Sequence, residues 1–423
     1  MPEWKDYSKE QLLKLKAEYR RKYEEYRSLG LNLDMSRGKP SPDLLDLSNG
    51  LLAGLDTYTA EDGADIRNYG VLTGIPECRR LFSDLLDIPA EQIIIGNNAS
   101  LELMNNVFSR LCLFGAQGHT PWSKLDKVKF LCPSPGYDRH FAISEAYGAE
   151  MQIIPMTENG PDMDVVEELV KRDGSVKGIW CNPLYSNPQG IVYSDETVGR
   201  LAAMETKAKD FRIFWDNAYG VHHIYEEHKI ADILRLAEKA GNGDRVYYFF
   251  STSKITFPGG GISMMAASEA NIAEQKKHIS VQTIGYDKIN QMRTVKFFKS
   301  AEGIREHMVK LGALIRPKFD LVMDTLDREF GGTGLLKWIR PKGGYFISVD
   351  TLEGCAKEVV AAAKAAGAKL TSAGLTFPYG KDPMDSNIRI APTYPAPDEL
   401  RSAMNLLCVC IKLVSADKLL KEK

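Results

Sequence analysis

Between residues 90 and 251 the sequence alternates short apolar runs with longer amphipathic stretches, and this rhythm constrains the fold more than any other feature. The short runs have the length and the aromatic or β-branched content of buried strands, whereas the longer stretches have helical periodicity. Strands that alternate with helices form a mainly parallel sheet covered by helices on both faces. The predicted strands are 91–96, 127–133, 150–156, 176–182, 211–219 and 245–251, and the predicted helices are 99–114, 138–148, 195–209 and 232–241.

A different pattern follows the alternating region. Residues 286–328 are helical over a long stretch and lead into a mixed strand–helix unit at 338–393, after which comes one more long helix. A chain of 423 residues usually forms more than one domain. We therefore predict a large domain at 47–304 and a smaller α+β domain from residues 1–46 and 305–423, with the N-terminal segment packed on the C-terminal part.

Charge and cysteine usage narrow the possible functions. The formal net charge is −2, so the chain offers no electrostatic case for nucleic acid or an anionic membrane as its main partner. The first 30 residues predict a charged amphipathic helix without the apolar segment of a secretion signal. Seven scattered cysteines without a CxxC pair indicate buried thiols, and we expect a cytoplasmic protein.

Polar clusters follow the predicted strands. In a parallel sheet the carboxyl ends of the strands share one edge, where ligands bind. We therefore expect these clusters to converge on one site. They are residues 97–100, 133–137, 182–190, 216–219 and 251–254.

Lys254 follows the apolar strand 245–251 and precedes the glycines 259–261. A nucleotide-binding P-loop has the opposite order, with glycines before the lysine. A lone lysine is usually exposed at the surface. The apolar, glycine-rich surroundings instead favour an enclosed amine with a lowered pKa, which can attack an aldehyde.

Asp216 ends the apolar strand 211–219. In isolation it could simply start a turn. Alternatively it is a buried carboxylate that requires a cationic partner, and the protonated nitrogen of a pyridine ring is one such partner. Tyr219, three residues later, could then hydrogen-bond an oxygen on that ring.

Three further segments allow both a structural and a functional interpretation. The turn that contains Asn187 is rigid, and its amide could also donate to a ring oxygen. Residues 96–100 lead into a helix, so Ser100 could cap that helix or help to bind an anion. Tyr137 could stack on an aromatic ring or pack in the core.

Three histidines lie close together in the sequence, at positions 222, 223 and 228. Their spacing fits no zinc motif, and we predict no metal site. We interpret this segment as an exposed loop with weak contacts to the core.

Six of these segments, taken in order, resemble the class I aminotransferases of pyridoxal-phosphate fold type I, and most closely a divergent bacterial branch of aspartate aminotransferases. The resemblance covers about residues 30–415. It implies a seven-stranded, mainly parallel sheet between helices, with a smaller α+β domain. It also implies a ping-pong transfer of an amino group, by Schiff-base chemistry on pyridoxal 5'-phosphate, between an L-amino acid (aspartate) and a 2-oxo acid (2-oxoglutarate). The segments are NYGVLTGIPECRRLF, PSPGYDRHF, NPLYSNPQG, DNAYG, STSK and NIRIAP.

The resemblance implies roles for individual residues. Lys254 would bond covalently to the cofactor and move the substrate proton, and Asp216 would pair with the pyridine nitrogen. Asn187 and Tyr219 would hold the phenolate oxygen. The remaining cofactor contacts would be phosphate ligands at Ala99, Ser100, Ser251 and Ser253, and a stacking ring at Tyr137.

The resemblance also implies contacts to the substrate and to a second subunit. Arg389 would bind the substrate's α-carboxylate as a bidentate fork, and the backbone of Gly38 would lie against the substrate. Tyr69 would reach the phosphate of a neighbouring subunit, so a homodimer with shared active sites is expected.

One position departs from the family pattern. An arginine usually follows the lysine by eight residues and binds the phosphate, but this chain has Ile262 there. The phosphate therefore needs another source of positive charge, or only hydroxyl and N–H donors. The sequence also does not identify the residue that would bind the second carboxylate of a dicarboxylic substrate. Arg37 and Lys288 are weak candidates.

Two alternatives remain open. A carbon–sulfur β-lyase would use the same lysine and cofactor. A non-enzymatic regulator that binds pyridoxal phosphate would carry a DNA-reading domain in front of the core, and only about 45 residues precede the core here.

Overall fold

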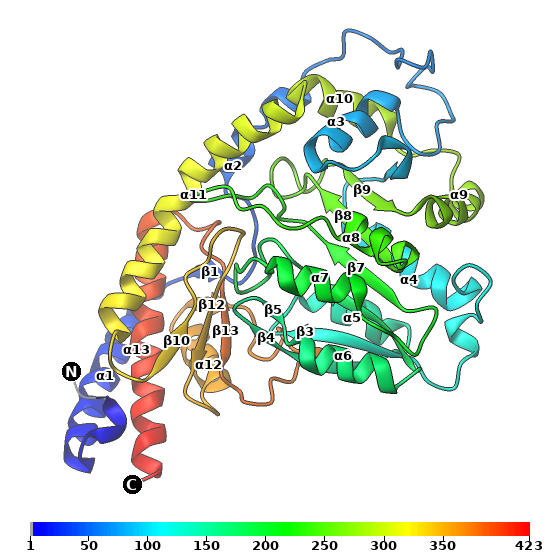
Figure 1. The fold of residues 1–423 in the computed structure, drawn as a ribbon. Coiled ribbons are helices and arrows are strands. Elements are labelled where there is room, and N and C mark those ends of the chain that lie inside the picture. Colours follow the sequence, from blue (N-terminus) through cyan, green and yellow to red (C-terminus); the bar gives the residue numbers. More distant parts are fainter. Residues whose placement is uncertain (1–2) are drawn as a thin grey trace.

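The computed structural model describes residues 3–423 and contains a large sheet of eight strands (Figure 1). The central strand pairs are parallel, as predicted. The predicted count of seven strands was one too low, because a two-residue strand pairs antiparallel with β4 at one edge. In spatial order the strands are β2 (Ile93–Ile95), β9 (Ser263–Ala267), β8 (Val246–Ser251), β7 (Arg212–Asp216), β6 (Val176–Cys181), β3 (Lys129–Ser134), β4 (Glu150–Thr157) and β5 (Gly160–Pro161).

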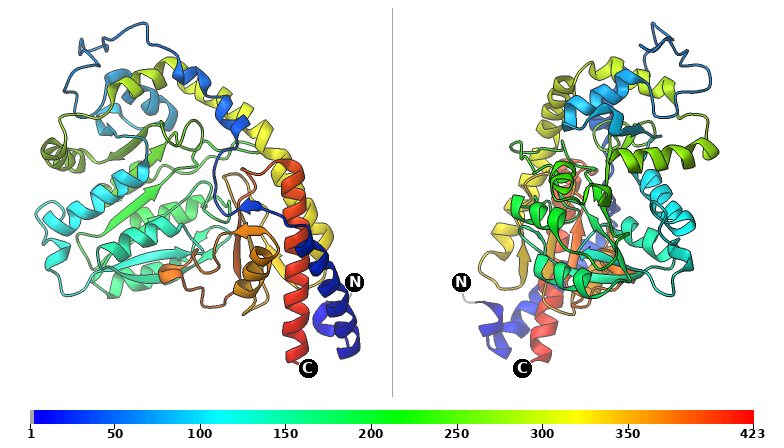
Figure 2. Two further views of the ribbon diagram at one scale, coloured as in Figure 1. Left: turned by 180° about the vertical axis from the view of Figure 1, so that it is seen from behind. Right: turned by 45° about the vertical axis from the view of Figure 1, so that its right-hand side comes forward.

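Helices cover both faces of this sheet (Figures 1 and 2). Alternate side chains of one strand enter different cores, since Ile213 and Trp215 pack on one face and Phe214 on the other. This alternation explains why the strands are apolar throughout. One face carries α6 (Met163–Arg172), α7 (Asp195–Ala203) and α8 (Ile233–Lys239), and the other carries α4 (Ser100–Phe114), α5 (Asp138–Ala146) and α9 (Glu269–Gln282).

The strand β9 was missed in the sequence. It pairs antiparallel with both β8 and β2, and so it inserts between two elements that are far apart in the chain. Its residues, SMMAA, are short and lack β-branched side chains, so they gave little strand signal.

A smaller region packs beside the large sheet. The strand β1 (Leu33–Met35) pairs with β12 (Ala368–Leu370), so the N-terminal segment contacts the C-terminal part of the chain. A separate antiparallel sheet has the order β10–β11–β13. Its strands are β10 (Leu336–Trp338), β11 (Ile347–Thr351) and β13 (Asn387–Ile390), and the region's helices are α1 (Lys9–Ser28), α12 (Ala356–Ala365) and α13 (Pro397–Lys421).

Two long helices shape this part of the molecule. The helix α11 (Ala301–Phe330) runs from beside α10 (Lys288–Phe298) to the smaller region, and α1 lies along α13 (Figures 1 and 2). The proposed boundary at residues 304–305 falls within α11 and stays a prediction. The other short helices are α2 (Pro42–Asp46), α3 (Pro76–Leu86), η1 (Trp4–Asp6), η2 (Asn49–Leu52), η3 (Ala90–Gln92), η4 (Trp122–Lys124), η5 (Gly243–Arg245) and η6 (Pro378–Gly380).

All seven cysteines are buried and unpaired, as expected from their positions in apolar segments. Within residues 3–423 every helix is too short or too polar to span a bilayer.

Candidate active site

Polar segments from separate strands meet at the carboxyl edge of the large sheet. The side chain of Asn182, directly after β6, donates to the Asp216 carbonyl at the end of β7 with a distance of 2.7 Å. The hydroxyl of Ser253, after β8, donates to the Asn98 carbonyl at 2.7 Å. These two bonds join the segment after β6 to the end of β7, and the segment after β8 to the loop before α4.

Lys254 is an enclosed amine. Its Nζ donates to the Gly38 carbonyl at 2.9 Å and lies 5.0 Å from the centroid of the Tyr345 ring. Burial, reinforced by the positive charge of Arg389 and opposed by Asp216, lowers the pKa of Lys254 to about 8. A substantial fraction of this amine is thus neutral and nucleophilic near physiological pH.

Asp216 is 2% exposed and has one satisfied and one unsatisfied carboxylate oxygen. Its Oδ2 lies 2.8 Å from Nε2 of His140, whereas Oδ1 has no hydrogen-bond partner within the described chain. A buried carboxylate oxygen without a donor is costly, so Oδ1 marks a place for a cationic N–H group.

His140 was missed in the sequence, although it lies within the segment PGYDRHF. Its ring stacks on Trp180 with centroids 4.5 Å apart and an interplanar angle of 6°. The Trp180 indole in turn donates to Ser144 at 2.9 Å. These contacts orient the imidazole toward Asp216. The available signal was its place on the first turn of a helix, three residues after Tyr137.

Asn187 and Tyr219 are both buried near this carboxylate. Asn187 Oδ1 accepts from Arg389 at 3.3 Å, which leaves its Nδ2 donor without a partner among residues 3–423. Burial, then the neighbouring Tyr137 and Asp216, raises the pKa of Tyr219 well above its usual value. Both groups are therefore neutral donors. The Tyr137 ring lies edge-on to His140 at 5.0 Å.

The N-terminus of α4 provides anion-binding groups. Its N-cap residue is Ala99, which has no side-chain oxygen to cap the first turn, and Ser100 follows as the first helical residue. N–H groups left uncapped at a helix N-terminus attract anions. The buried Ser251 ends β8, and Ser253 is tied to the loop before α4 through Asn98.

Ile262 is fully buried at the position where the resemblance predicts an arginine. Its backbone forms two bonds with Thr252, at 2.8 and 2.9 Å, and its side chain belongs to the apolar core. The glycines before it serve a structural role, since the Gly260 and Gly261 carbonyls accept from Asn290 at 2.9 and 3.0 Å. An arginine here would place a charge within the core.

Arg389, on β13, is directed toward the site from the smaller region. It donates to Asp138 at 3.0 Å and to Asn187, and its guanidinium carbon lies 4.7 Å from the centroid of the Phe346 ring. Gly38 lies on the same side, and a Cβ added to it would lie 2.5 Å from the Phe346 ring. Only glycine therefore fits at this position.

The histidine segment is not an exposed loop, so that interpretation was wrong. His222 is fully buried and lies edge-on to the Tyr345 ring with centroids 4.8 Å apart. The Gly344 N–H donates to the His222 carbonyl, which holds the segment against the loop before β11. Burial, Lys254 and His223 together lower the pKa of His222 to about 3, so it is neutral.

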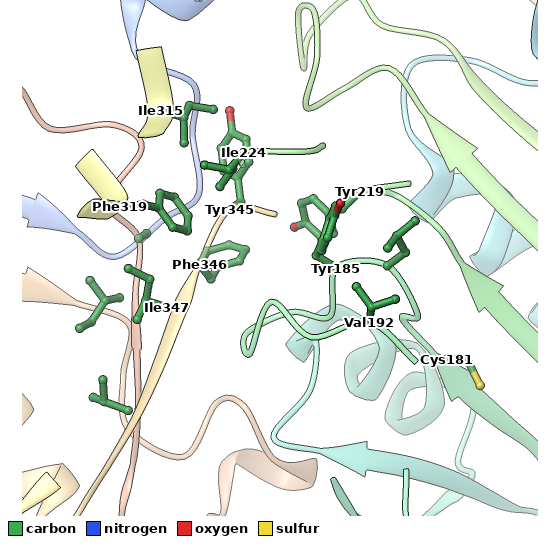
Figure 3. Packing of buried hydrophobic residues seen from close by; sticks show 14 of the residues in the cluster. Cys181, Tyr185, Val192, Tyr219, Ile224, Ile315, Phe319, Tyr345, Phe346 and Ile347 are labelled. Atoms are coloured by element: carbon green, nitrogen blue, oxygen red, sulfur yellow. The ribbon is translucent and has the colours of Figure 1, made fainter. Parts of the chain in front are cut away.

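Aromatic side chains from the large-sheet region and from the smaller region lie where these two regions meet. Figure 3 shows Tyr345 and Phe346 on the side of the smaller sheets and Tyr185 and Tyr219 on the side of the large sheet. Sequence reasoning did not identify Tyr345, because its importance depends on two distant segments meeting.

Three candidate residues lie outside this cluster. Tyr69 is 81% exposed in the loop before α3, and Arg37 is also exposed. Lys288 is 5% exposed and donates to the carbonyl of Gly70, next to Tyr69, at 3.1 Å.

The polar groups of this site define what it can bind. Asp216 Oδ1 suits a cationic ring nitrogen, and the Asn187 amide and the Tyr219 hydroxyl suit an anionic ring oxygen. The α4 N-terminus suits a phosphate, and Lys254 suits an aldehyde carbon.

Comparisons with known proteins agree with this chemistry. The family described as aspartate amino-transferase matches residues 7–423. A protein from Mycolicibacterium smegmatis that is assigned to the aminotransferases without a stated substrate is 50% identical over 95% of this chain and 96% of its own length. An aspartate aminotransferase from Corynebacterium glutamicum is 44% identical over 97% of this chain and 96% of its own length. The solved structure of an aspartate transaminase from that species has a TM-score of 0.96 at 44% identity and covers 98% of this chain and 99% of its own.

Proposed function

Because the chain belongs to the aspartate aminotransferase family, we propose that it transfers the amino group of an L-amino acid, preferably aspartate, to a 2-oxo acid, preferably 2-oxoglutarate. The cofactor is pyridoxal 5'-phosphate, which supplies an electron sink for the bonds at the substrate's Cα. The observation that carries the proposal is a half-buried amine of lowered pKa, Lys254, close to a buried carboxylate, Asp216, at the carboxyl ends of two adjacent strands of one sheet.

Each unsatisfied group of the site has a role toward that cofactor. Asp216 Oδ1 would pair with the protonated pyridine nitrogen, with Oδ2 held by His140. Asn187 Nδ2 and the Tyr219 hydroxyl would donate to the phenolate oxygen. The Tyr137 ring would flank the pyridine. The pattern of donors and acceptors therefore fits this cofactor.

Lys254 and Arg389 would act on the substrate. Arg389 would bind the α-carboxylate through its guanidinium fork, in competition with its present contact to Asp138. Lys254 Nζ would then take the proton from the substrate's Cα and later donate it to C4′ of the cofactor. A pKa of about 8 suits an amine that both accepts and releases a proton near neutral pH.

The phosphate would be held without an arginine at position 262. Ala99 and Ser100 would contribute N–H groups and a hydroxyl at the N-terminus of α4, and Ser251 and Ser253 would contribute hydroxyls. The macrodipole of α4 would supply part of the missing positive charge. We expect Ser253→Ala to weaken cofactor retention, which dialysis followed by absorbance spectroscopy would measure.

We further propose a homodimer in which Tyr69 completes the partner's site. Its side chain is 81% exposed in the single chain, so it is free to contact a second subunit. Two inactive variants, Tyr69→Ala and Lys254→Ala, should regain activity when they are mixed under conditions of subunit exchange. Each hybrid dimer then contains one site with both native residues. Absence of regained activity, in hybrids verified by mass spectrometry, would reject the shared site.

Lys288 is better placed than Arg37 to bind the side-chain carboxylate of a dicarboxylic substrate. It is buried without an acidic partner among residues 3–423, and its bond to Gly70 places it beside Tyr69, so both would face the same partner site. We expect Lys288→Gln to lower kcat/KM for aspartate while leaving that for alanine unchanged. The matched control is Arg37→Gln, since Arg37 is exposed.

The deciding experiment is a panel of amino donors with 2-oxoglutarate as acceptor. Aspartate should give glutamate at the highest kcat/KM, ahead of aromatic and branched-chain donors. Release of ammonia and pyruvate without an acceptor would instead identify a β-lyase. We place this reaction in the cytoplasm, which cell fractionation would test.

A further inference from the structure

A cavity of about 840 Å³ lies at the edge of the large sheet opposite to the edge that carries Lys254. The amino ends of two central strands reach it, since Arg212 is the first residue of β7 and Arg245 directly precedes β8. Residues of α8, the N-terminus of α9 and loop residues at 87–89, 117, 119 and 209 also line it. Cavities of this volume commonly hold small-molecule ligands.

Two arginines that line the cavity form no salt bridge within residues 3–423. Arg212 is 2% exposed, and its Nη1 donates to the neighbouring Phe211 carbonyl at 3.0 Å while its Nε has no partner among residues 3–423. Arg245 is partly buried and donates to the Met204 carbonyl at 2.7 Å. Burial, and then the charge of Arg212, lowers the pKa of Arg245.

Within residues 3–423 the five carboxylates that line the cavity form no salt bridge with Arg212 or Arg245. Arg235 already engages Asp87 at 3.0 Å and Asp232 at 3.4 Å. Asp244 accepts the hydroxyl of Ser268. The two remaining carboxylates of the wall are exposed to solvent and belong to Glu238 and Glu269.

We propose that this cavity binds a phosphate-type oxyanion between Arg212 and Arg245. A guanidinium group cannot shed its proton on burial, so two neighbouring guanidinium groups without a salt-bridge partner attract an anion. Its planar donors match phosphate oxygens, and a dianion balances two positive charges. The volume also accommodates the organic part of a phosphate monoester.

Calorimetric titration of the holoenzyme, in a buffer free of phosphate and sulfate at constant chloride, tests this proposal. The probes are inorganic phosphate and glycerol phosphate. We expect Arg245→Gln to weaken binding of both by roughly tenfold or more, because a hydrogen-bonded charge is lost. The matched control is Arg235→Gln, which removes a paired charge from the same wall and should change affinity less than about threefold, within the range for exposed pairs.

Arg212→Met provides a second test that does not depend on Arg245. Phosphate should raise the melting temperature of the parent protein and of Arg235→Gln, but not that of Arg212→Met or Arg245→Gln. Tighter binding of glycerol phosphate would indicate that the organic part is also recognised, and tighter binding of inorganic phosphate would indicate the free ion. Equal binding by the parent and Arg245→Gln, or no binding by the parent, would overturn the proposal.

Discussion

Both edges of the large sheet carry positively charged side chains with little access to solvent, but only the side chain at the carboxyl edge can lose its proton. At the carboxyl edge the cation is the half-buried Lys254, whose pKa falls to about 8 and which can lose its proton. At the amino edge the cations are the buried Arg212 and the partly buried Arg245, which stay charged. The same burial therefore makes a reactive amine at one edge and a receptor for an anion at the other.

Removing the amine of Lys254 should have the largest effect. Lys254→Ala should reduce transamination by at least about 10³-fold, because both the nucleophile and the proton carrier are lost. Borohydride reduction and peptide mass spectrometry should find the cofactor attached at Lys254 in the parent only. The control is Lys318→Gln, since Lys318 is a buried lysine that bonds to the Thr393 carbonyl outside the site. Attachment that survives Lys254→Ala would disprove the assignment.

The second largest loss of activity is expected when the carboxylate of Asp216 is neutralised. Asp216→Asn keeps the size of the side chain but removes its charge, and we expect kcat to fall by about 10²–10³-fold. His140→Asn should cost roughly tenfold, because it removes one hydrogen bond to the carboxylate. Steady-state kinetics measures both. An equal loss in the two variants would mean that His140 acts directly in the chemistry.

Removing one member of a salt bridge near the amino edge should lower the free energy of unfolding more than removing one of the two arginines. Asp210 bonds to Lys177 at 2.7 Å and to the Trp122 indole at 2.9 Å, and all three are buried. Asp210→Ala leaves Lys177 uncompensated and should lower the free energy of unfolding by about 3–5 kcal/mol.

Arg245→Met is the comparison for that stability change. In phosphate-free buffer it should change the free energy of unfolding by less than about 1 kcal/mol, because it removes a charge that lacks a partner. Urea denaturation of both variants gives the values. A large destabilisation by Arg245→Met would mean that an internal partner already compensates the arginine.

The smallest expected effect is a shift of the lysine pKa. Arg389→Gln removes the positive charge that, after burial, lowers the pKa of Lys254. The amine is reactive only when it is deprotonated, so the pH midpoint for cofactor capture by the apoenzyme should rise above about 8. Arg37→Gln, which changes an exposed arginine, should leave the midpoint in place. A lower midpoint in Arg389→Gln would contradict the sign of this interaction.

The alternation of strands and helices was readable because every central strand is buried on both faces. Local periodicity then reports the sheet directly, and the ends of the strands locate Asp216 and Lys254. The strand β9 was not readable, because its pairing depends on β2 and β8 rather than on its own composition. The same limit hid the eighth strand, which is two residues long.

The amino-acid sequence by itself determined the order of the elements and the residues that end each strand, since both depend on neighbours in the chain. Only the tertiary structure decided that His140 supports Asp216 and that His222 lies buried beside Tyr345. It alone placed Arg212 and Arg245 together without a salt bridge to either within residues 3–423. These features arise between segments far apart in the sequence, and burial of charge is a property of the whole fold.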